Sequence, residues 1–280
     1  MTAMEPDAAV ALIGDTGTAV DLRLAAIDAA RFDATSHPEV IASLLAVLGN
    51  RADEPAVRRA ALGALRENTF RVAAFRQYAP DYLNTLRGIL DDPNQQLRER
   101  VVEVLALEND EYTQRRLLDG LENPEVALVA PQRALQLLGY DLHAEHYELL
   151  RDFAGQDTDP AARNTALRLL AADGASADLF ARILQDRSQD LGARALSGVA
   201  LSSLAPAEFS SVAEEIVLDD TDDDDLRATL LTALSHGTAR PERADLAERV
   251  LAHASTPELT RAAEQYAQAA PAEAEETTDG

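Results

Sequence analysis

The sequence predicts an all-α protein, an α-solenoid of about eight helical-hairpin repeats. Three observations support this fold class. A short arginine-containing pattern recurs every 31 to 40 residues, a second apolar helical pattern lies between successive copies, and no segment shows strand alternation bounded by hairpin turns. Because one helical hairpin cannot bury its apolar face alone, such repeats are expected to stack on their neighbours into a superhelix.

The first helix of each repeat carries the arginine. In each copy an apolar or small residue precedes it, and small or apolar residues follow three, four and seven positions later, apart from the polar Ser197. This spacing is one face of an α-helix. In the copy at 130–138 Pro131 takes the place of arginine. We expect the arginines to reach acidic side chains or free carbonyls at neighbouring turns; they are Arg23, Arg58, Arg98, Arg163, Arg194, Arg227 and, in a weaker copy, Arg261.

The second helix of each repeat follows after a short break. Two helices of about 10 to 14 residues and two turns account for the length of one repeat. The expected second helices are 39–48, 81–90, 111–121, 143–153, 177–186, 208–218 and 244–253. The chain therefore divides into an N-terminal lead-in (1–17), the repeat solenoid (18–270) and an acidic tail (271–280) that we expect to be disordered.

The repeats resemble the HEAT-repeat family, especially its short repeats of the phycobilisome-lyase type. The resemblance rests on first helices that start at Asp and Pro and carry the arginine, as in DDPNQQLRERVVEVL (91–105) and DTDPAARNTALRLL (157–170). It implies the fold, because the family is defined by packing, and it names no functional residues in this chain.

Composition excludes several classes of protein. The 280 residues carry 49 acidic and 25 basic side chains, a net charge of -24, and every basic residue is arginine. Cysteine is absent, which excludes disulfides and thiolate metal sites. Neither a signal peptide nor a membrane span is expected, and we predict a cytoplasmic protein. The acidity indicates either adaptation of the host, for example to a salty cytoplasm, or attraction of a basic protein partner.

The run LDDTDDDDLR (218–227) contains six aspartates. A calcium loop starting at Asp220 would need glycine and glutamate where Asp225 and Leu231 stand, so an EF-hand is excluded. The alternative is a turn before a helix, where one or two acids cap the free amides. We expect the remaining acids to serve solubility, salt tolerance or a basic partner.

Other candidates for chemistry are few. His143 and His146 stand three positions apart, but a metal site normally needs three or four ligands, and we expect exposed helix residues and no metal. The chain lacks the His-Glu dipeptides of HEAT-like deoxyhypusine hydroxylases, nucleophile elbows and phosphate loops. The charge disfavours nucleic acid. No cofactor is predicted.

Residues 70–82 differ from the rest of the chain. They hold four of its twelve aromatic residues, and within 58–116 ten arginines accompany nine acids. Aromatic and arginine side chains are favoured as binding anchors. The predicted partner-binding residues are Phe70, Arg71, Phe75, Arg76, Tyr78 and Tyr82. The alternative is an extended helix connection whose aromatics fill a larger gap between repeats.

The sequence thus favours a non-enzymatic scaffold or adaptor that binds a protein partner along the solenoid surface. No convergent nucleophile, base and orienting group is visible. A bilin-lyase-like enzyme or enzyme accessory, acting on a modified or chromophore-bearing protein, is the alternative that the family resemblance implies. The sequence leaves the partner and the oligomeric state open.

Overall fold

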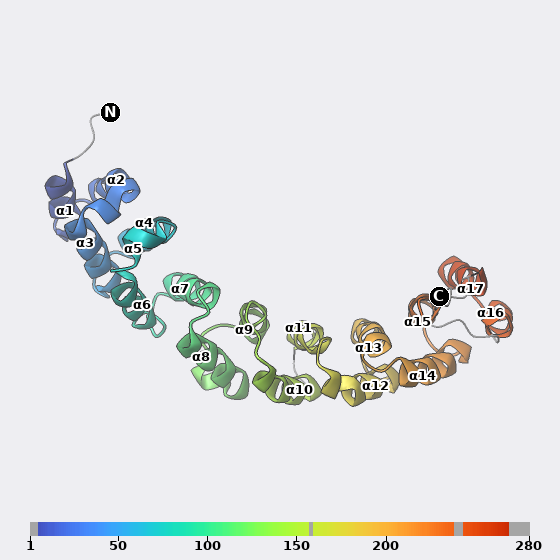
Figure 1. The fold of residues 1–280 in the computed structure, drawn as a ribbon. Helices are drawn as coiled ribbons and strands as arrows, with labels where there is room; N and C mark the ends of the chain where they lie inside the picture. The colour runs from blue at the N-terminus through green and yellow to red at the C-terminus, as the bar shows by residue number, and fades with distance from the viewer. Residues whose placement is uncertain (1–4, 157–158, 238–242, 269–280) are drawn as a thin grey trace, which may run out of the picture. The chain divides into compact units, whose positions relative to one another are not determined.

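The structure is a computed structural model that describes residues 5–156, 159–237 and 243–268 (Figure 1). These residues form helices and turns, and no strand occurs among them. Helices pack against their neighbours in sequence order, which confirms the predicted α-solenoid class. The chain divides into two compact units, Met1–Asp141 and Leu142–Gly280, which we describe separately.

Unit 1 is a two-layered stack. One row holds α1, α3, α6 and α8, and the other holds α2, α4, α7 and α9; each helix packs on at least one helix of the opposite row (Figure 1). Short 3-10 helices (η) and the one-turn α5 lie in the connections. The elements are α1 (Pro6–Gly14), α2 (Val20–Ala30), η1 (Arg31–Ser36), α3 (Pro38–Gly49), α4 (Pro55–Thr69), α5 (Val72–Phe75), α6 (Ala79–Arg87), α7 (Gln95–Leu107), α8 (Glu111–Glu122), η2 (Pro124–Val126) and α9 (Pro131–Leu138).

Unit 2 repeats this arrangement. Even-numbered helices form one row and odd-numbered helices the other, with α13 packed on α12, α14 and α15. The elements are η3 (Ala144–His146), α10 (Tyr147–Gly155), α11 (Pro160–Leu170), η4 (Gly174–Ser176), α12 (Ala177–Gln185), α13 (Leu191–Leu204), α14 (Pro206–Leu218), α15 (Asp224–Ser235), α16 (Arg243–Leu251) and α17 (Pro257–Gln268).

Helix starts follow from capping chemistry. Proline occupies the first position of α1, α3, α4, α9, α11, α14 and α17, where its missing amide donor is not needed. Four other starts, and α11 in addition to its proline, have a side-chain oxygen that accepts a hydrogen bond from a free amide of the first turn. Their capping residues are Asn94, Asp110, Asp159, Asp190 and Asp223.

All seven expected second helices are present, and the one expected over 143–153 starts with the 3-10 turn η3. The lead-in contains a helix that the sequence analysis did not predict. α1 packs on α2 and α3, and its Ala9 and Ile13 are buried. It takes the place of a second helix ahead of the first arginine helix. The expected tail at 271–280 lies outside the described residues.

The repeated arginines link successive repeats, and we call each arginine together with its acceptors a rung. Arg23 on α2 donates Nε to the carbonyl of Ile13 (3.1 Å) and its terminal nitrogens to both carboxylate oxygens of Asp53 (2.6 and 2.7 Å). Asp53 lies in the turn before the next arginine helix, α4. Each rung therefore joins three segments: the helix behind, the arginine helix itself and the turn of the repeat ahead.

The same rung recurs along both units. Arg58 donates to the carbonyl of Leu48 (3.0 Å) and to Asp92 (2.7 Å). In unit 2, Arg163 donates to the carbonyl of Ala154 and to the side chain of Gln189. Arg194 donates to the carbonyl of Leu184 and to the carboxylate of Asp222. The arginine-to-carbonyl separation is nine or ten residues throughout, so the repeat geometry is regular.

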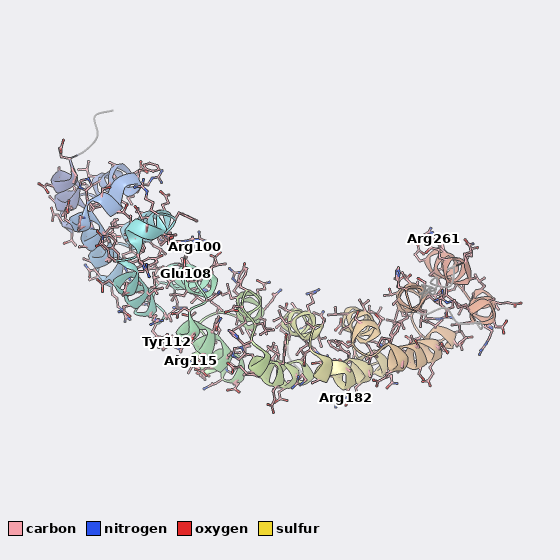
Figure 2. All side chains as sticks on the ribbon, in the orientation of Figure 1. Arg100, Glu108, Tyr112, Arg115, Arg182 and Arg261 are labelled. Atoms are coloured by element: carbon pink, nitrogen blue, oxygen red, sulfur yellow. The ribbon has the colours of Figure 1, made fainter. Side chains whose placement is uncertain are left out.

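Three of the seven predicted arginines deviate from this geometry. Arg227 donates to the carbonyl of Val217 (3.0 Å), but its acid is Asp224 of its own helix (2.7 Å). Arg98 is half-buried and donates to the backbone carbonyl of Asp92 (2.7 Å). Arg261 projects, exposed, from α17, and no hydrogen bond or ion pair involves it within the described part of the chain (Figure 2).

A second, unpredicted set of arginines links the other row of helices. Arg87 of α6 donates Nε to Asp110 (2.9 Å), which also caps α8 through the amide of Thr113. Arg151 of α10 pairs with Asp173, the capping residue of η4. In both cases one carboxylate accepts hydrogen bonds from an amide at a helix start and from an arginine of the preceding helix. Neighbouring repeats are therefore linked in both rows of helices.

Candidate protein-binding surface

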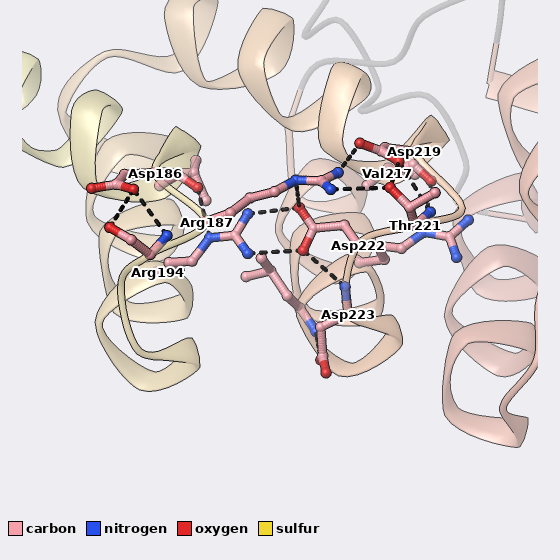
Figure 3. Close-up of polar contacts among 12 residues, drawn as sticks. Asp186, Arg187, Arg194, Val217, Asp219, Thr221, Asp222 and Asp223 are labelled. Carbon is pink, nitrogen blue, oxygen red and sulfur yellow. Dashed lines mark hydrogen bonds and ion pairs between the residues drawn. The ribbon is translucent and has the colours of Figure 1, made fainter.

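The aspartate run is built into the repeat contacts of unit 2 (Figure 3). Asp222 receives both terminal nitrogens of Arg194 (2.8 and 2.7 Å) and the amide of Asp223 (2.8 Å). Hydrogen bonding from Arg194 lowers the pKa of Asp222. Asp223 caps α15 by accepting the amides of Asp225 (3.0 Å) and Leu226 (3.1 Å).

Two further aspartates of the run also have partners. Asp219 accepts the hydroxyl (2.6 Å) and the amide (3.0 Å) of Thr221 and pairs with Arg187 (Figure 3). Asp224 accepts the hydroxyl of Ser255 (2.5 Å), which precedes α17. Asp223 alone caps α15, as one or two acids were expected to do, but the expectation that the other acids serve only solubility, salt tolerance or a partner is wrong for Asp219, Asp222 and Asp224.

Only two acids of the run are left without such a structural role. Asp220 is 57% exposed and lies 3.8 Å from His253 Nδ1, and Asp225 is exposed on the first turn of α15. The run is therefore mainly a repeat-to-repeat turn, and its excess of surface charge is small.

The expectation that His143 and His146 are exposed helix residues is wrong: His143 is exposed but precedes η3, and His146, in η3, has a side chain only 14% exposed. The rings of His143 and His146 lie 5.7 Å apart in an edge-on arrangement, and His146 Nε2 is 3.5 Å from Glu145. Across the described ranges, no group of three or more His, Cys, Asp or Glu side chains is placed to hold a metal ion. No helix in those ranges is long and apolar enough to cross a membrane.

The strongest candidate for a binding surface is a hollow in unit 1, between the end of α4, α5 and α6. Its volume is about 760 Å³, and its walls are mostly apolar. We call it the α4–α6 hollow. Its lining residues are Thr69, Phe70, Val72, Ala73, Phe75, Arg76, Ala79, Tyr82, Leu83 and Glu108.

The floor of the hollow is a packed aromatic cluster. Phe75 and Tyr82 are buried and meet edge to face with their ring centroids 5.4 Å apart, and Tyr78 lies 6.0 Å from Phe75. The hydroxyls of Tyr78 and Tyr82 are buried without a hydrogen-bond partner among the described residues. Burial raises the pKa of Tyr82, so its phenol is neutral over the physiological pH range. The cluster forms a packed, buried base beneath the exposed residues.

Two large apolar side chains stand at the mouth of the hollow in contact with solvent. Phe70 is 84% exposed and Val72 is 73% exposed, the highest values among the large apolar side chains of the described chain. Phe70 directly follows α4, and Val72 is the first residue of the one-turn α5. Large apolar side chains gathered around a concavity mark sites of interaction.

Charged side chains border this apolar surface. Arg76 is exposed at the end of α5, and Glu108 follows the last turn of α7 (Figure 2). The turn at Glu108 is fixed because Asn109 adopts a left-handed conformation (φ 54°), which asparagine tolerates at helix ends. Arg71 is exposed and donates to the hydroxyl of Thr35 (3.5 Å), which ties the connection to η1.

The structure thus separates the six predicted partner-binding residues into two groups. Phe70, Arg71 and Arg76 are exposed, whereas Phe75 and Tyr82 are buried and Tyr78 is half-buried. The sequence analysis missed Val72 and Glu108, which line the same hollow. The gap-filling interpretation of 70–82 fits the buried Phe75 and Tyr82, and Phe70, Arg71 and Arg76 are the predicted binding residues that are exposed.

Comparison with known proteins identifies no relative: neither a protein-family model nor a curated protein sequence matches this chain.

Proposed function

We propose that this protein is a non-enzymatic interaction scaffold that binds a protein partner through the α4–α6 hollow. The observation that carries the proposal is the exposure of Phe70 (84%) and Val72 (73%) at an apolar hollow whose floor is a packed aromatic cluster. Burying one such side chain against a partner contributes about 1.5 to 3 kcal/mol. Solenoids of stacked repeats offer extended surfaces suited to this role. The arginine position shared by the repeats supports our further proposal that they are of the HEAT type.

The test is capture of a partner from cells of the source organism. The tagged full-length protein, cross-linked before lysis, is compared with the double variant Phe70→Ser/Val72→Ser by quantitative mass spectrometry. We expect at least one protein to be recovered about tenfold less with the variant, because the apolar anchor is lost. Its direct binding is then measured with purified components.

A matched control separates the hollow from general loss of apolar surface. Tyr140, also in unit 1, is 59% exposed and lies outside the hollow, so Tyr140→Ser should leave recovery unchanged. Circular dichroism checks that each variant stays folded. Equal recovery of every captured protein with wild type and the double variant would contradict the proposal.

A further inference from the structure

The α4–α6 hollow is lined by one cation and one anion. Arg76 and Glu108 are both exposed and both line the hollow. Within the described part of the chain, neither side chain forms a hydrogen bond or ion pair, and no ion pair joins the two. An occupant complementary to the hollow therefore carries an anion and a cation together with an apolar group.

The surface around the hollow presents the same three groups. Phe70 and Val72 supply large apolar side chains in contact with solvent, and Arg76 and Glu108 supply one charge of each sign. An apolar hollow with exposed apolar residues and both charges at its border is self-complementary. Two copies related by a two-fold axis make each contact twice, because the same surface is used on both sides of the interface.

The distribution of charge along the chain also favours contact between two copies at this place. Two chains of net charge -24 repel each other where their acidic surfaces approach. Residues 58–116, which include the whole lining of the hollow, carry ten arginines and nine acids and are nearly neutral. Charges outside the contact are screened beyond about 8 Å at physiological salt. The hollow is therefore a place where two such chains meet at a small electrostatic cost.

Exposed apolar surface extends beyond the hollow itself. Phe32 is exposed on η1, and η1 packs against α5. Asn68 of α4 donates to the carbonyl of Arg31 (2.6 Å), which holds η1 beside the end of α4. A second copy seated on the hollow thus has further apolar surface next to it.

We infer that two copies of this chain associate through their α4–α6 hollows in a two-fold symmetric dimer. Phe70 and Val72 of each copy pack on the hollow of the other copy, and Arg76 of each copy pairs with Glu108 of the other. The inference rests on the proposed function and names a second copy of the chain as the partner of that site. In the cellular capture experiment, the protein lost with Phe70→Ser/Val72→Ser is then the untagged chain itself.

The experiment is sedimentation velocity of the full-length protein at physiological ionic strength over a range of concentrations. We expect the mass to rise with concentration from 30.1 kDa to twice that value. Phe70→Ser/Val72→Ser should weaken association by roughly a hundredfold, because the two-fold axis removes each apolar contact twice. Tyr140→Ser, at an exposed position outside the hollow, should leave association unchanged.

Charge reversal tests the pairing of Arg76 with Glu108. Arg76→Glu makes both charges of the hollow negative, and Glu108→Arg makes both positive, so each variant alone should associate about tenfold more weakly. An equimolar mixture of the two variants should recover association as a one-to-one heterodimer, because every pair across the interface then joins opposite charges. Arg76→Glu/Glu108→Arg, in which the two signs are exchanged, should dimerise on its own for the same reason.

Arg115→Glu is the matched charge control. Arg115 is exposed on α8 of the same unit and does not line the hollow (Figure 2), so its reversal should leave association unchanged. Circular dichroism checks that each variant stays folded. Recovery on mixing separates a lost contact from a damaged fold, because two damaged chains would not restore each other.

Three outcomes would each overturn the inference: a wild-type chain that sediments as a monomer at every concentration, a dimer unaffected by Phe70→Ser/Val72→Ser, or a mixture of the two charge variants that stays monomeric. Its failure is distinguishable from failure of the proposed function. If the wild-type chain is monomeric but cellular capture of another protein depends on Phe70 and Val72, the scaffold proposal stands and the second copy is the wrong partner.

Discussion

Removal of the carboxylate of Asp222 should destabilise unit 2 far more than removal of its neighbour Asp220. The side chains of Arg194 and Asp222 are 3% and 5% exposed and share two hydrogen bonds of 2.7 to 2.8 Å. Asp222→Ala leaves the guanidinium buried with the carbonyl of Leu184 as its remaining partner. Breaking a buried ion pair from one side costs about 3 to 5 kcal/mol, because an uncompensated charge stays behind.

The assay is urea unfolding at pH 7 followed by circular dichroism, with hydrogen exchange resolving the amides of α13 and α15. Exchange is informative because stability in repeat stacks is spread over neighbouring units and can be lost locally. Asp220→Ala is the matched control in the same run. Its carboxylate is 57% exposed, so we expect a change within about 0.5 kcal/mol.

The double variant Arg194→Met/Asp222→Leu tests the reason for the loss. With both charges replaced by apolar groups no buried charge is left unpaired, and most of the stability lost in Asp222→Ala should return. Equal, small losses for Asp222→Ala and Asp220→Ala would refute the rung as a stabilising contact. Equal, large losses would show that the run acts through its total charge.

Three further predictions concern pH, glycine positions and salt. Hydrogen bonds from arginine lower the pKa of Asp53 and Asp222 below the usual value of 3.8, so both carboxylates stabilise the folded protein above that pH and lose this effect as the pH falls through the lowered pKa values. The urea midpoint of unfolding should therefore stay level down to about pH 4 and then drop, and the drop should be smaller in Asp222→Ala. Gly120→Ala should lower the free energy of unfolding by about 1 to 3 kcal/mol because the new methyl group would lie 2.9 Å from the backbone of Ala127. Gly63→Ala is the contrasting variant: its methyl group would have no atom within 4 Å, and we expect it to raise the free energy of unfolding by about 0.5 to 1 kcal/mol. Thermal melts of both variants test these opposite signs. Melting temperature should rise from low to molar potassium chloride because salt screens the repulsion within a chain of net charge -24, and an unchanged melting temperature would contradict the salt-adaptation account.

The fold was predictable because the repeat imposes one apolar spacing on the first helix of each unit and a second apolar helix between copies. α1 escaped prediction because it has nine residues and precedes the first arginine. The spacing of the repeats could have indicated this helix. The other rung arginines contact a carbonyl at a helix end nine or ten residues earlier in the chain, and the same spacing before Arg23 places a helix end at Ile13.

For each rung the sequence predicts the arginine but not the side chain that accepts its hydrogen bonds. The arginine slot is conspicuous in the sequence, but its acceptors lie 26 to 34 residues further on and differ in type, with Gln189 standing where Asp53, Asp92 and Asp222 stand in other repeats. Local patterns cannot pair residues at such separations. The arginine and its acceptor come within hydrogen-bond distance only when the helices of neighbouring repeats are stacked.

The α4–α6 hollow lies at the segment that the sequence singled out, but its lining residues were not predictable. Four aromatic residues within 70–82 mark the segment, but α5 is a single turn, too short for a periodic pattern to show which side chains face inward. The helix α6 then buries Tyr82 against Phe75, and Phe70 and Val72 are left at the surface. An aromatic-rich connection thus contains both buried and exposed large side chains, and only the three-dimensional packing shows which residue is which.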